Sequence, residues 1–267
     1  LELARDREIH AVILQGEGGV FCSGADLKYI RAGGEEADLG YLEPRITRPD
    51  RPGYGPIFKQ ILEYIHSTLS EIRRAPKPFI AVVEGPVAAG GLGIALCCDL
   101  VLASEDATFE WAYFRTGLTG AEGSTFFLPR LVGLRRAMDI ALLGPRLSAS
   151  QALEYGLISR VCPASKLALH AFSLAHELAS GPTGAYAAAK ALLNQSAGMD
   201  GFDAHLDREL DALSRIADGD DFAEGLEAFF EKRAPRFRGD RAPERAPAAD
   251  PSSDPSLAST QRKPRHA

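Results

Sequence analysis

Two short glycine-centred turns constrain this chain more than any other feature of its sequence. The first is Phe21-Cys-Ser-Gly-Ala-Asp-Leu-Lys28, and it follows the apolar run Ala11-Val-Ile-Leu14. The second is Gly85-Pro-Val-Ala-Ala-Gly-Gly-Leu-Gly93, and it follows the run Pro78-Phe-Ile-Ala-Val-Val83. A strand that ends in small residues and opens into a helix leaves backbone N–H groups without an internal partner. Two such ends side by side would hold one oxygen atom between two main-chain donors, as an oxyanion hole does.

Composition is that of an ordinary globular protein and argues against some kinds of partner. The chain has 267 residues, of which 45% are hydrophobic and 25% charged, enough for one sizeable core or two modest domains. Its net charge of −6 argues against a nucleic-acid surface. No apolar stretch has membrane-spanning length, and the four cysteines form no C-x-x-C pair and have no histidine at metal spacing. We therefore expect a cytoplasmic protein with buried cysteines, no metal, no nucleic-acid partner and no membrane association.

Apolar runs along the chain predict βαβ units and a mostly parallel sheet. The predicted strands are Ala11–Leu14, Phe79–Val83, Asp99–Ala103 and Thr108–Phe109. Helices are predicted at Ile57–Arg74, Gly93–Cys98 and Ser124–Leu131. From Ser148 onward the pattern predicts helices alone: Ser148–Tyr155, Ser165–Ala179, Gly184–Ser196, Phe202–Ala217 and Phe222–Arg233. Residues 31–56 are rich in Gly, Pro and charge and predict a long irregular loop, and residues 241–267 predict a disordered tail.

The two turns, in this order and with Pro-Lys-Pro and Cys-Asp-Leu-Val flanking the second, resemble those of the crotonase (enoyl-CoA hydratase/isomerase) family. The likeness covers roughly residues 1–240. It implies an α/β fold of the crotonase type, with a ββα superhelix core over residues 1–147. A helical C-terminal region over residues 148–240 would mediate assembly into a trimer or hexamer. Members of the family usually begin with a hairpin, and we expect that segment to be missing here.

The resemblance also implies a substrate and a set of site residues. An acyl-CoA thioester is the expected substrate, with coenzyme A entering only as part of it and no permanently bound cofactor. The N–H groups of Ala25 and Gly90 are the expected oxyanion donors, and Lys28 would lie close to the coenzyme. The other expected substrate-binding residues are Gly24, Asp26, Gly91, Gly93, Tyr113 and Lys232. Lys232 lies in the segment Phe230-Glu-Lys-Arg233, which the resemblance places near a coenzyme phosphate. The plainer alternative is a pair of tight strand-to-helix turns that bind nothing.

Two departures from the hydratase pattern affect the expected reaction. Hydratases of this family use two glutamates, and their positions here hold Gly93 and Tyr113. The segment Gly117–Arg130 instead resembles the branch of ring-1,2-epoxyphenylacetyl-CoA isomerases and related double-bond isomerases, which use one carboxylate in this loop. An ungapped alignment puts that carboxylate at Ala121, so the neighbouring Glu122 is the candidate base. The alternative for Glu122 is a carboxylate that merely favours the start of a helix.

We expect double-bond isomerisation of an enoyl thioester, with three alternatives left open. The first is a hydratase (lyase) using another base. The second is a substrate-assisted decarboxylase or dehalogenase-like enzyme, and the third is a non-catalytic acyl-CoA-binding homologue. Several further side chains have a structural explanation that we prefer to a catalytic one: His66 packed or solvated, Cys22 buried, Glu110 on the surface, and Ser124 and Thr125 as helix caps.

Overall fold

The computed structural model describes residues 2–34 and 53–239 of the chain. The predicted disordered tail and most of the predicted loop over residues 31–56 lie outside the described residues. The strands are β1 (Val12–Gln15), β2 (Phe79–Val83), β3 (Pro86–Ala88), β4 (Leu100–Ser104), β5 (Thr108–Glu110), β6 (Arg146–Ser148) and β7 (Arg160–Cys162). The α-helices of the first half are α1 (Glu2–Arg5), α2 (Leu27–Arg31), α4 (Gly55–Arg74), α5 (Gly90–Cys97) and α6 (Ser124–Leu143). Those of the second half are α7 (Ala149–Glu154), α8 (Leu167–Ser180), α9 (Thr183–Ser196), α10 (Phe202–Ala217) and α11 (Asp220–Glu231).

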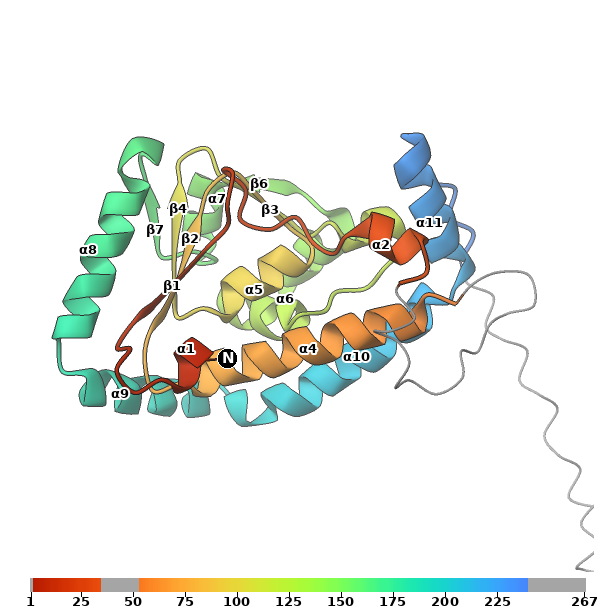
Figure 1. Cartoon of the computed structure of the whole chain (residues 1–267). Coiled ribbons are helices and arrows are strands. Elements are labelled where there is room, and N and C mark those ends of the chain that lie inside the picture. Colours follow the sequence, from red (N-terminus) through yellow and green to blue (C-terminus); the bar gives the residue numbers. More distant parts are fainter. Residues whose placement is uncertain (1, 35–52, 240–267) are drawn as a thin grey trace, which may run out of the picture.

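A parallel four-stranded sheet in the order β1-β2-β4-β7 forms the centre of the molecule, and a smaller sheet in the order β3-β5-β6 adjoins it (Figure 1). Strand β2 is buried along its whole length, and its successive side chains point to opposite faces of the sheet. Ile80 and Val82 pack with Leu102 beneath α8, while Ala81 and Val83 belong to the larger core on the opposite face. Helix α8 therefore covers one face of the sheet, and the elements of the candidate site lie over the other.

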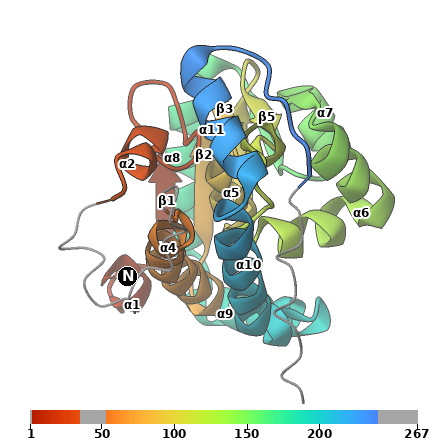
Figure 2. The same ribbon diagram turned by 90° about the vertical axis from the view of Figure 1, so that its right-hand side faces the viewer.

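Helices α4 and α10 lie side by side along one edge of that larger core in both views (Figures 1 and 2). Helix α4 ends at Arg74, before Pro76, as the sequence predicts, but it begins at Gly55, two residues earlier than predicted, with Pro56 in its first turn. Helix α10 presents its buried stripe of Phe202, Leu206 and Leu213 toward the core. This packing brings the C-terminal part of the chain into direct contact with the part that carries the two turns.

The structure corrects several predicted elements, and it adds β6, which pairs antiparallel with β5 and was not predicted. The prediction of helices alone after Ser148 missed β7, a three-residue strand that pairs with β4 and completes the sheet. The segment Gly85–Gly93 contains the short strand β3, and α5 begins at Gly90 rather than at Gly93. Helix α6 does not end at Leu131. It bends at Gly133, whose φ of 77° breaks the helical path, and then continues to Leu143.

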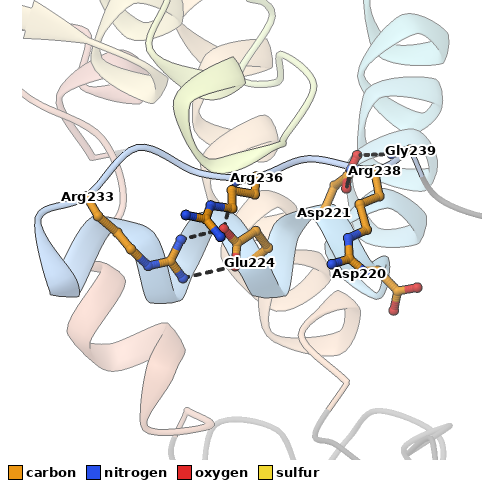
Figure 3. A pocket seen from close by; sticks show the side chains of 7 residues that line it. All are labelled: Asp220, Asp221, Glu224, Arg233, Arg236, Arg238 and Gly239. Atoms are coloured by element: carbon orange, nitrogen blue, oxygen red, sulfur yellow. Dashed lines mark hydrogen bonds and ion pairs between the residues drawn. The ribbon is translucent and has the colours of Figure 1, made fainter.

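Residues 233–239 run back along α11 and are held there by acidic side chains (Figure 3). Arg233 donates to both carboxylate oxygens of Glu224, and the backbone N–H of Arg236 donates to Glu224 Oε1 over 2.7 Å. The backbone N–H of Arg238 donates to Asp221 over 2.9 Å. These contacts hold residues 233–239 against α11, the helix that carries Phe229 and Phe230. Within residues 2–34 and 53–239 we find no helix long and apolar enough to cross a membrane.

Candidate active site

The two glycine-centred turns meet in the structure, as the sequence predicts. The N–H of Ala88 donates to the carbonyl of Cys22 over 3.0 Å, and Cys22 forms a parallel bridge with Val87. A Cβ placed on Gly24 would lie 3.0 Å from the Ala89 side chain and 3.8 Å from the Gly90 nitrogen. The approach is closer still at Gly91, where an added Cβ would lie only 2.1 Å from the carbonyl oxygen of Cys22. Glycine is therefore required for the two backbones to come this close.

Ala25 and Gly90 both line a cavity of about 560 Å³. Gly90 is the first residue of α5, so its N–H has no partner within the helix. The preceding Ala89 adopts φ 46° and ψ −123°, a conformation that a non-glycine residue rarely takes and that is typical of strained functional turns. Within the described part of the chain, neither the Ala25 nor the Gly90 N–H has a hydrogen-bond acceptor. Both N–H groups are therefore without an acceptor among the described residues.

The cavity combines these polar backbone groups with apolar walls. It is lined by residues of the first turn, of α4 and α5, of the Tyr113–Thr116 segment and of the C-terminal helices: Ser23, Gly24, Ala25, Asp26, Leu27, Lys28, Phe58, Ala89, Gly90, Ala112, Tyr113, Arg115, Thr116, Leu118, Glu122, Leu213, Phe229 and Phe230. Apolar walls with a few convergent polar groups are typical of sites for small organic ligands.

Glu122 is the carboxylate that the structure places beside the Gly90 backbone. A Cβ added to Gly90 would lie 2.9 Å from Glu122 Oε1. The Glu122 side chain is only 6% exposed and accepts a hydrogen bond from the Tyr113 hydroxyl, which also donates to the Ala121 carbonyl over 3.2 Å. The backbone of Glu122 has a positive φ of 53°, followed by 72° at Gly123. This left-handed turn directs the Glu122 side chain to the cavity wall, which Ala121 does not reach.

The surroundings of Glu122 tune its acidity. Burial raises the pKa of this carboxyl to about 7, the hydrogen bond from Tyr113 opposes the rise, and the nearby Glu209 carboxylate adds to it. Burial, together with the Glu122 charge, raises the pKa of Tyr113 well above its usual range, so the phenol stays protonated and donates. A carboxyl that titrates near neutral pH can both accept and return a proton at that pH.

The glycine at position 93 leaves no room for a side chain. A Cβ there would lie 2.3 Å from the carbonyl oxygen of Glu122 and 2.9 Å from its Cβ. The turn that carries Glu122 therefore occupies the space that a residue with a side chain would need at Gly93. Glu122 and a glutamate at position 93 exclude each other in this packing arrangement.

Of the remaining predicted site residues, Asp26 and Lys28 line the cavity, whereas Gly91 and Lys232 do not. Asp26 lines it but uses its carboxylate as the N-cap of α2, accepting from the N–H of Lys28 over 2.8 Å. Lys28 is exposed at the cavity. Gly91 packs against the first turn without lining the cavity. Lys232 directly follows α11 and is exposed, but it does not line the cavity of this single chain.

Three sequence interpretations near the site are wrong. Glu110 is not on the surface: it is 6% exposed and its carboxylate pairs with Arg115 and Arg146. Ser124 does not cap α6, because its hydroxyl donates to the carbonyl of Ala121. Thr125 does not cap it either, since its hydroxyl bonds to Glu209. The cysteine prediction holds for Cys97, Cys98 and Cys162, whereas Cys22 is half-buried.

Some residues of the site were not predicted at all. Phe58, Leu213, Phe229 and Phe230 line the cavity from α4, α10 and α11. Glu209 contacts the turn at Glu122 from α10, and the sequence did hold a signal for it. Glu209 stands in the apolar stripe of an amphipathic helix, between Leu206 and Leu213, and a carboxylate in that place needs buried partners.

Comparisons with known proteins agree with this geometry. Residues 59–240 match the model of the family described as enoyl-CoA hydratase/isomerase. The chain is 36% identical over 240 residues to 1,2-epoxyphenylacetyl-CoA isomerase from Escherichia coli K12, covering 89% of this chain and 84% of that one. It is 35% identical to a probable enoyl-CoA hydratase from Rhodobacter capsulatus, covering 87% and 82%. The chain belongs to the enoyl-CoA hydratase/isomerase family.

The fold of this family member is also that of the crotonases. The crystal structure of an enoyl-CoA hydratase from Mycobacterium avium subsp. paratuberculosis K-10 is similar to it with a TM-score of 0.74 and 33% identity. That similarity covers 89% of this chain and 83% of the other. The resemblance predicted from the two turns, and the α/β crotonase-type fold that it implies, are thus confirmed.

Proposed function

We propose that the protein isomerises the double bond of an enoyl-CoA thioester, with Glu122 as the single proton shuttle. The observation that carries the proposal is one buried carboxyl, that of Glu122, beside the Gly90 backbone, in a cavity whose described lining holds no second buried carboxylate. The other acidic residue of the lining, Asp26, is already committed to the α2 N-terminus. The similarity to 1,2-epoxyphenylacetyl-CoA isomerase from Escherichia coli supports isomerase chemistry on a coenzyme A thioester in general.

The N–H groups of Ala25 and Gly90 would receive the thioester oxygen. Neither has a protein partner among residues 2–34 and 53–239, and both residues line the cavity. When a proton leaves the α-carbon, negative charge moves onto that oxygen, and preorganised donors stabilise it more in the transition state than in the substrate. One such donor contributes about 3 kcal/mol, so two would contribute on the order of 5–6 kcal/mol.

Glu122 would move the proton in both directions. As a carboxylate it takes the α-proton of a 3-enoyl thioester, and the electron pair of the broken C–H bond delocalises into a dienolate whose oxygen lies at the two N–H groups. The carboxylic acid then returns a proton to the γ-carbon, which leaves the double bond conjugated with the thioester. Because its pKa is about 7, Glu122 is suited to both steps near neutral pH. The hydrogen bond from Tyr113 holds the carboxylate during the transfer.

Binding of the rest of the substrate follows from the lining of the cavity. Phe58, Phe229 and Phe230 offer apolar walls for the acyl chain. The exposed Lys28 supplies positive charge for the coenzyme part. Coenzyme A would thus enter only as part of the substrate, and no other cofactor is proposed.

Assembly into a homotrimer or hexamer is part of the proposal. Large apolar side chains are exposed on α6, α8 and α9, including Leu134, Leu142, Leu143, Leu169, Phe172, Leu192 and Leu193. Where such side chains adjoin one another on a surface, they are typical of contacts with other chains. In such an assembly Lys232 would meet coenzyme phosphate bound by a neighbouring subunit.

Proton exchange tests the proposal. The protein is incubated with an acyl-CoA in D₂O, and loss of the α-proton is followed for the natural protein and for Glu122→Gln. Rapid exchange in the natural protein that Glu122→Gln abolishes supports the shuttle. Exchange that survives the substitution would remove Glu122 from its role.

The leading alternative is hydration by an enoyl-CoA hydratase, favoured by the similarity to the probable hydratase of Rhodobacter capsulatus. Loss of enoyl absorbance on incubation with crotonyl-CoA would reveal it. The packing at Gly93 speaks against the two-glutamate route, since no side chain fits there. Tight acyl-CoA binding without any exchange would instead indicate a non-catalytic acyl-CoA-binding protein.

A further inference from the structure

Glu209 on α10 is a buried carboxylate that does not line the cavity but contacts the segment carrying Glu122. It is 4% exposed, and its Oε2 accepts the N–H of Gly123 over 2.7 Å. Its Oε1 accepts the N–H of Thr125 over 3.0 Å and also the Thr125 hydroxyl. Both backbone donors belong to the start of α6, directly after Glu122. One side chain from α10 therefore satisfies two backbone donors at the start of a helix, 84 and 86 residues earlier in the chain.

The segment that Glu209 holds has an unfavourable backbone conformation. Glu122 and Gly123 have φ values of 53° and 72°, and a left-handed conformation at a residue with a side chain persists only where the surroundings enforce it. Ser124 closes the turn locally, since its N–H and its hydroxyl both donate to the Ala121 carbonyl, but α6 lacks a side-chain cap from its own first turn. From outside the segment, Glu209 accepts the N–H of Gly123 within the turn and the N–H of Thr125 after it.

We infer that Glu209 is a positioning residue, which holds the left-handed turn at Glu122–Gly123 so that the Glu122 carboxylate lies beside Gly90 at the cavity. The inference rests on the proposed role of Glu122. It makes the C-terminal helical region part of the catalytic apparatus, because α10 supplies the anchor. Phe202 of α10 packs against Phe127 of α6 close to this anchor, with 5.0 Å between the two ring centroids.

Several titratable groups face Glu209 and Glu122 and affect how the charge of these two carboxyls changes with pH. His66 on α4 faces Glu209 with Nε2 at 3.9 Å from Oε2, and His205 on α10 faces it with Nε2 at 3.6 Å from Oε1. Burial lowers the pKa of His66, whose Nε2 has no hydrogen-bond partner among the described residues. Glu122 is faced by Tyr113 and Glu209, and the other charged residues lining the cavity are Asp26, Lys28 and Arg115.

Three substitutions in the full chain test the inference. Glu209→Gln keeps the size of the side chain but replaces one carboxylate oxygen by an NH₂ group. That group cannot accept the N–H of Gly123 or Thr125, whichever it faces. Thr125→Val removes the hydroxyl bonded to Glu209 and leaves the backbone intact. Asp99→Asn is the matched control: Asp99 also accepts a backbone N–H, that of Phe79 over 2.9 Å, and pairs with Lys190, but lies at the opposite end of α5 from Gly90.

Two measurements are made on each variant. The first is the titration of the Glu122 carboxyl, read from the carboxyl band in infrared difference spectra against the same protein carrying Glu122→Gln. The second is α-proton exchange at saturating acyl-CoA together with the Kd for that acyl-CoA. For Glu209→Gln we expect the titration midpoint to fall below about 7 through loss of the Glu209 charge alone. The position of Glu122 is therefore read from exchange in Glu209→Gln and from the titration of Thr125→Val, which keeps that charge. Exchange should fall on the order of 10- to 100-fold, because the base is displaced. The Kd should change by less than about threefold, since the binding walls stay in place.

The outcomes separate the inference from the proposed function. Thr125→Val should show the same changes as Glu209→Gln to a smaller extent, and Asp99→Asn should lower stability without altering the Glu122 titration. Unchanged exchange in Glu209→Gln, together with an unchanged Glu122 titration in Thr125→Val, would overturn the inference, even where Glu122→Gln abolishes exchange and the function stands. If Glu122→Gln leaves exchange intact, the proposed function fails, and the Glu122 titration in Thr125→Val, where the Glu209 charge is kept, still decides whether the contact with Glu209 holds the turn.

Discussion

Substituting Gly93 by alanine tests the packing that reserves this site for Glu122. The added Cβ would lie 2.3 Å from the Glu122 carbonyl oxygen and 2.9 Å from both the carbonyl carbon and the Cβ of the same residue. All three contacts involve backbone or Cβ atoms, which cannot rotate away. The turn at Glu122 must therefore move as a whole.

The expected loss of stability follows from two opposing effects. Alanine is favoured over glycine in a helix by about 1 kcal/mol. Overpacking of a tight interior costs about 1–3 kcal/mol, and a contact with backbone atoms lies at the upper end of that range. Gly93→Ala should thus lower the free energy of unfolding by about 2 kcal/mol. Exchange of the α-proton should fall as well, because the displaced residue is Glu122 itself.

Urea unfolding followed by circular dichroism measures the stability change, with Gly184→Ala as the control. Gly184 is an exposed glycine near the start of α9, and a Cβ there would meet nothing within 4 Å. This control should be neutral or slightly more stable, with unchanged exchange. A Gly93→Ala protein that is as stable and as active as Gly184→Ala would refute the packing argument.

Three further predictions concern the same cavity. Tyr113→Phe removes the hydrogen bond that lowers the pKa of Glu122, so the pH at which exchange is half-maximal should rise above about 7 in a pH–rate profile. Glu122→Gln should stabilise the protein at pH 8 by on the order of 3 kcal/mol in urea unfolding, because the buried carboxyl must ionise there. The difference should shrink as the pH falls from about 7 toward 4.5, where the folded protein keeps the proton that the unfolded chain has released. Phe230→Ala should raise KM for the acyl-CoA and leave kcat nearly unchanged in steady-state assays, because Phe230 forms part of the cavity wall and takes no part in proton transfer. Its ring is held in place under the Arg31 guanidinium.

Elements with strong local patterns were predictable from the sequence. Strand β2 and helix α10 have the predicted bounds, because one is an unbroken apolar run after Pro78 and the other has a clear amphipathic period. Strand β7 was missed because three residues carry no period, and it forms only where the edge of β4 needs a partner. The extension of α6 beyond Leu131 was missed because Gly133 interrupts the pattern.

The site was predictable where it depends on backbone turns and not where it depends on distant contacts. The meeting of the two turns followed from their glycines and the strands before them. The candidate base, Glu122, followed from its place in the loop, but its neutral pKa depends on burial that no local pattern reveals. The contact between Glu209 and the N–H of Gly123 joins residues 86 positions apart, so only the packing of α10 against α6 brings it about.

The central claim is that two main-chain N–H groups and one carboxyl act on the same thioester. A crystal structure of the protein with a bound acyl-CoA tests it most directly. The claim predicts the thioester oxygen at about 2.7–3.1 Å from the nitrogens of both Ala25 and Gly90. It also predicts the α-carbon at about 3–3.5 Å from a Glu122 oxygen. A thioester bound elsewhere in the cavity, or a Glu122 carboxyl turned away from the α-carbon, would contradict it.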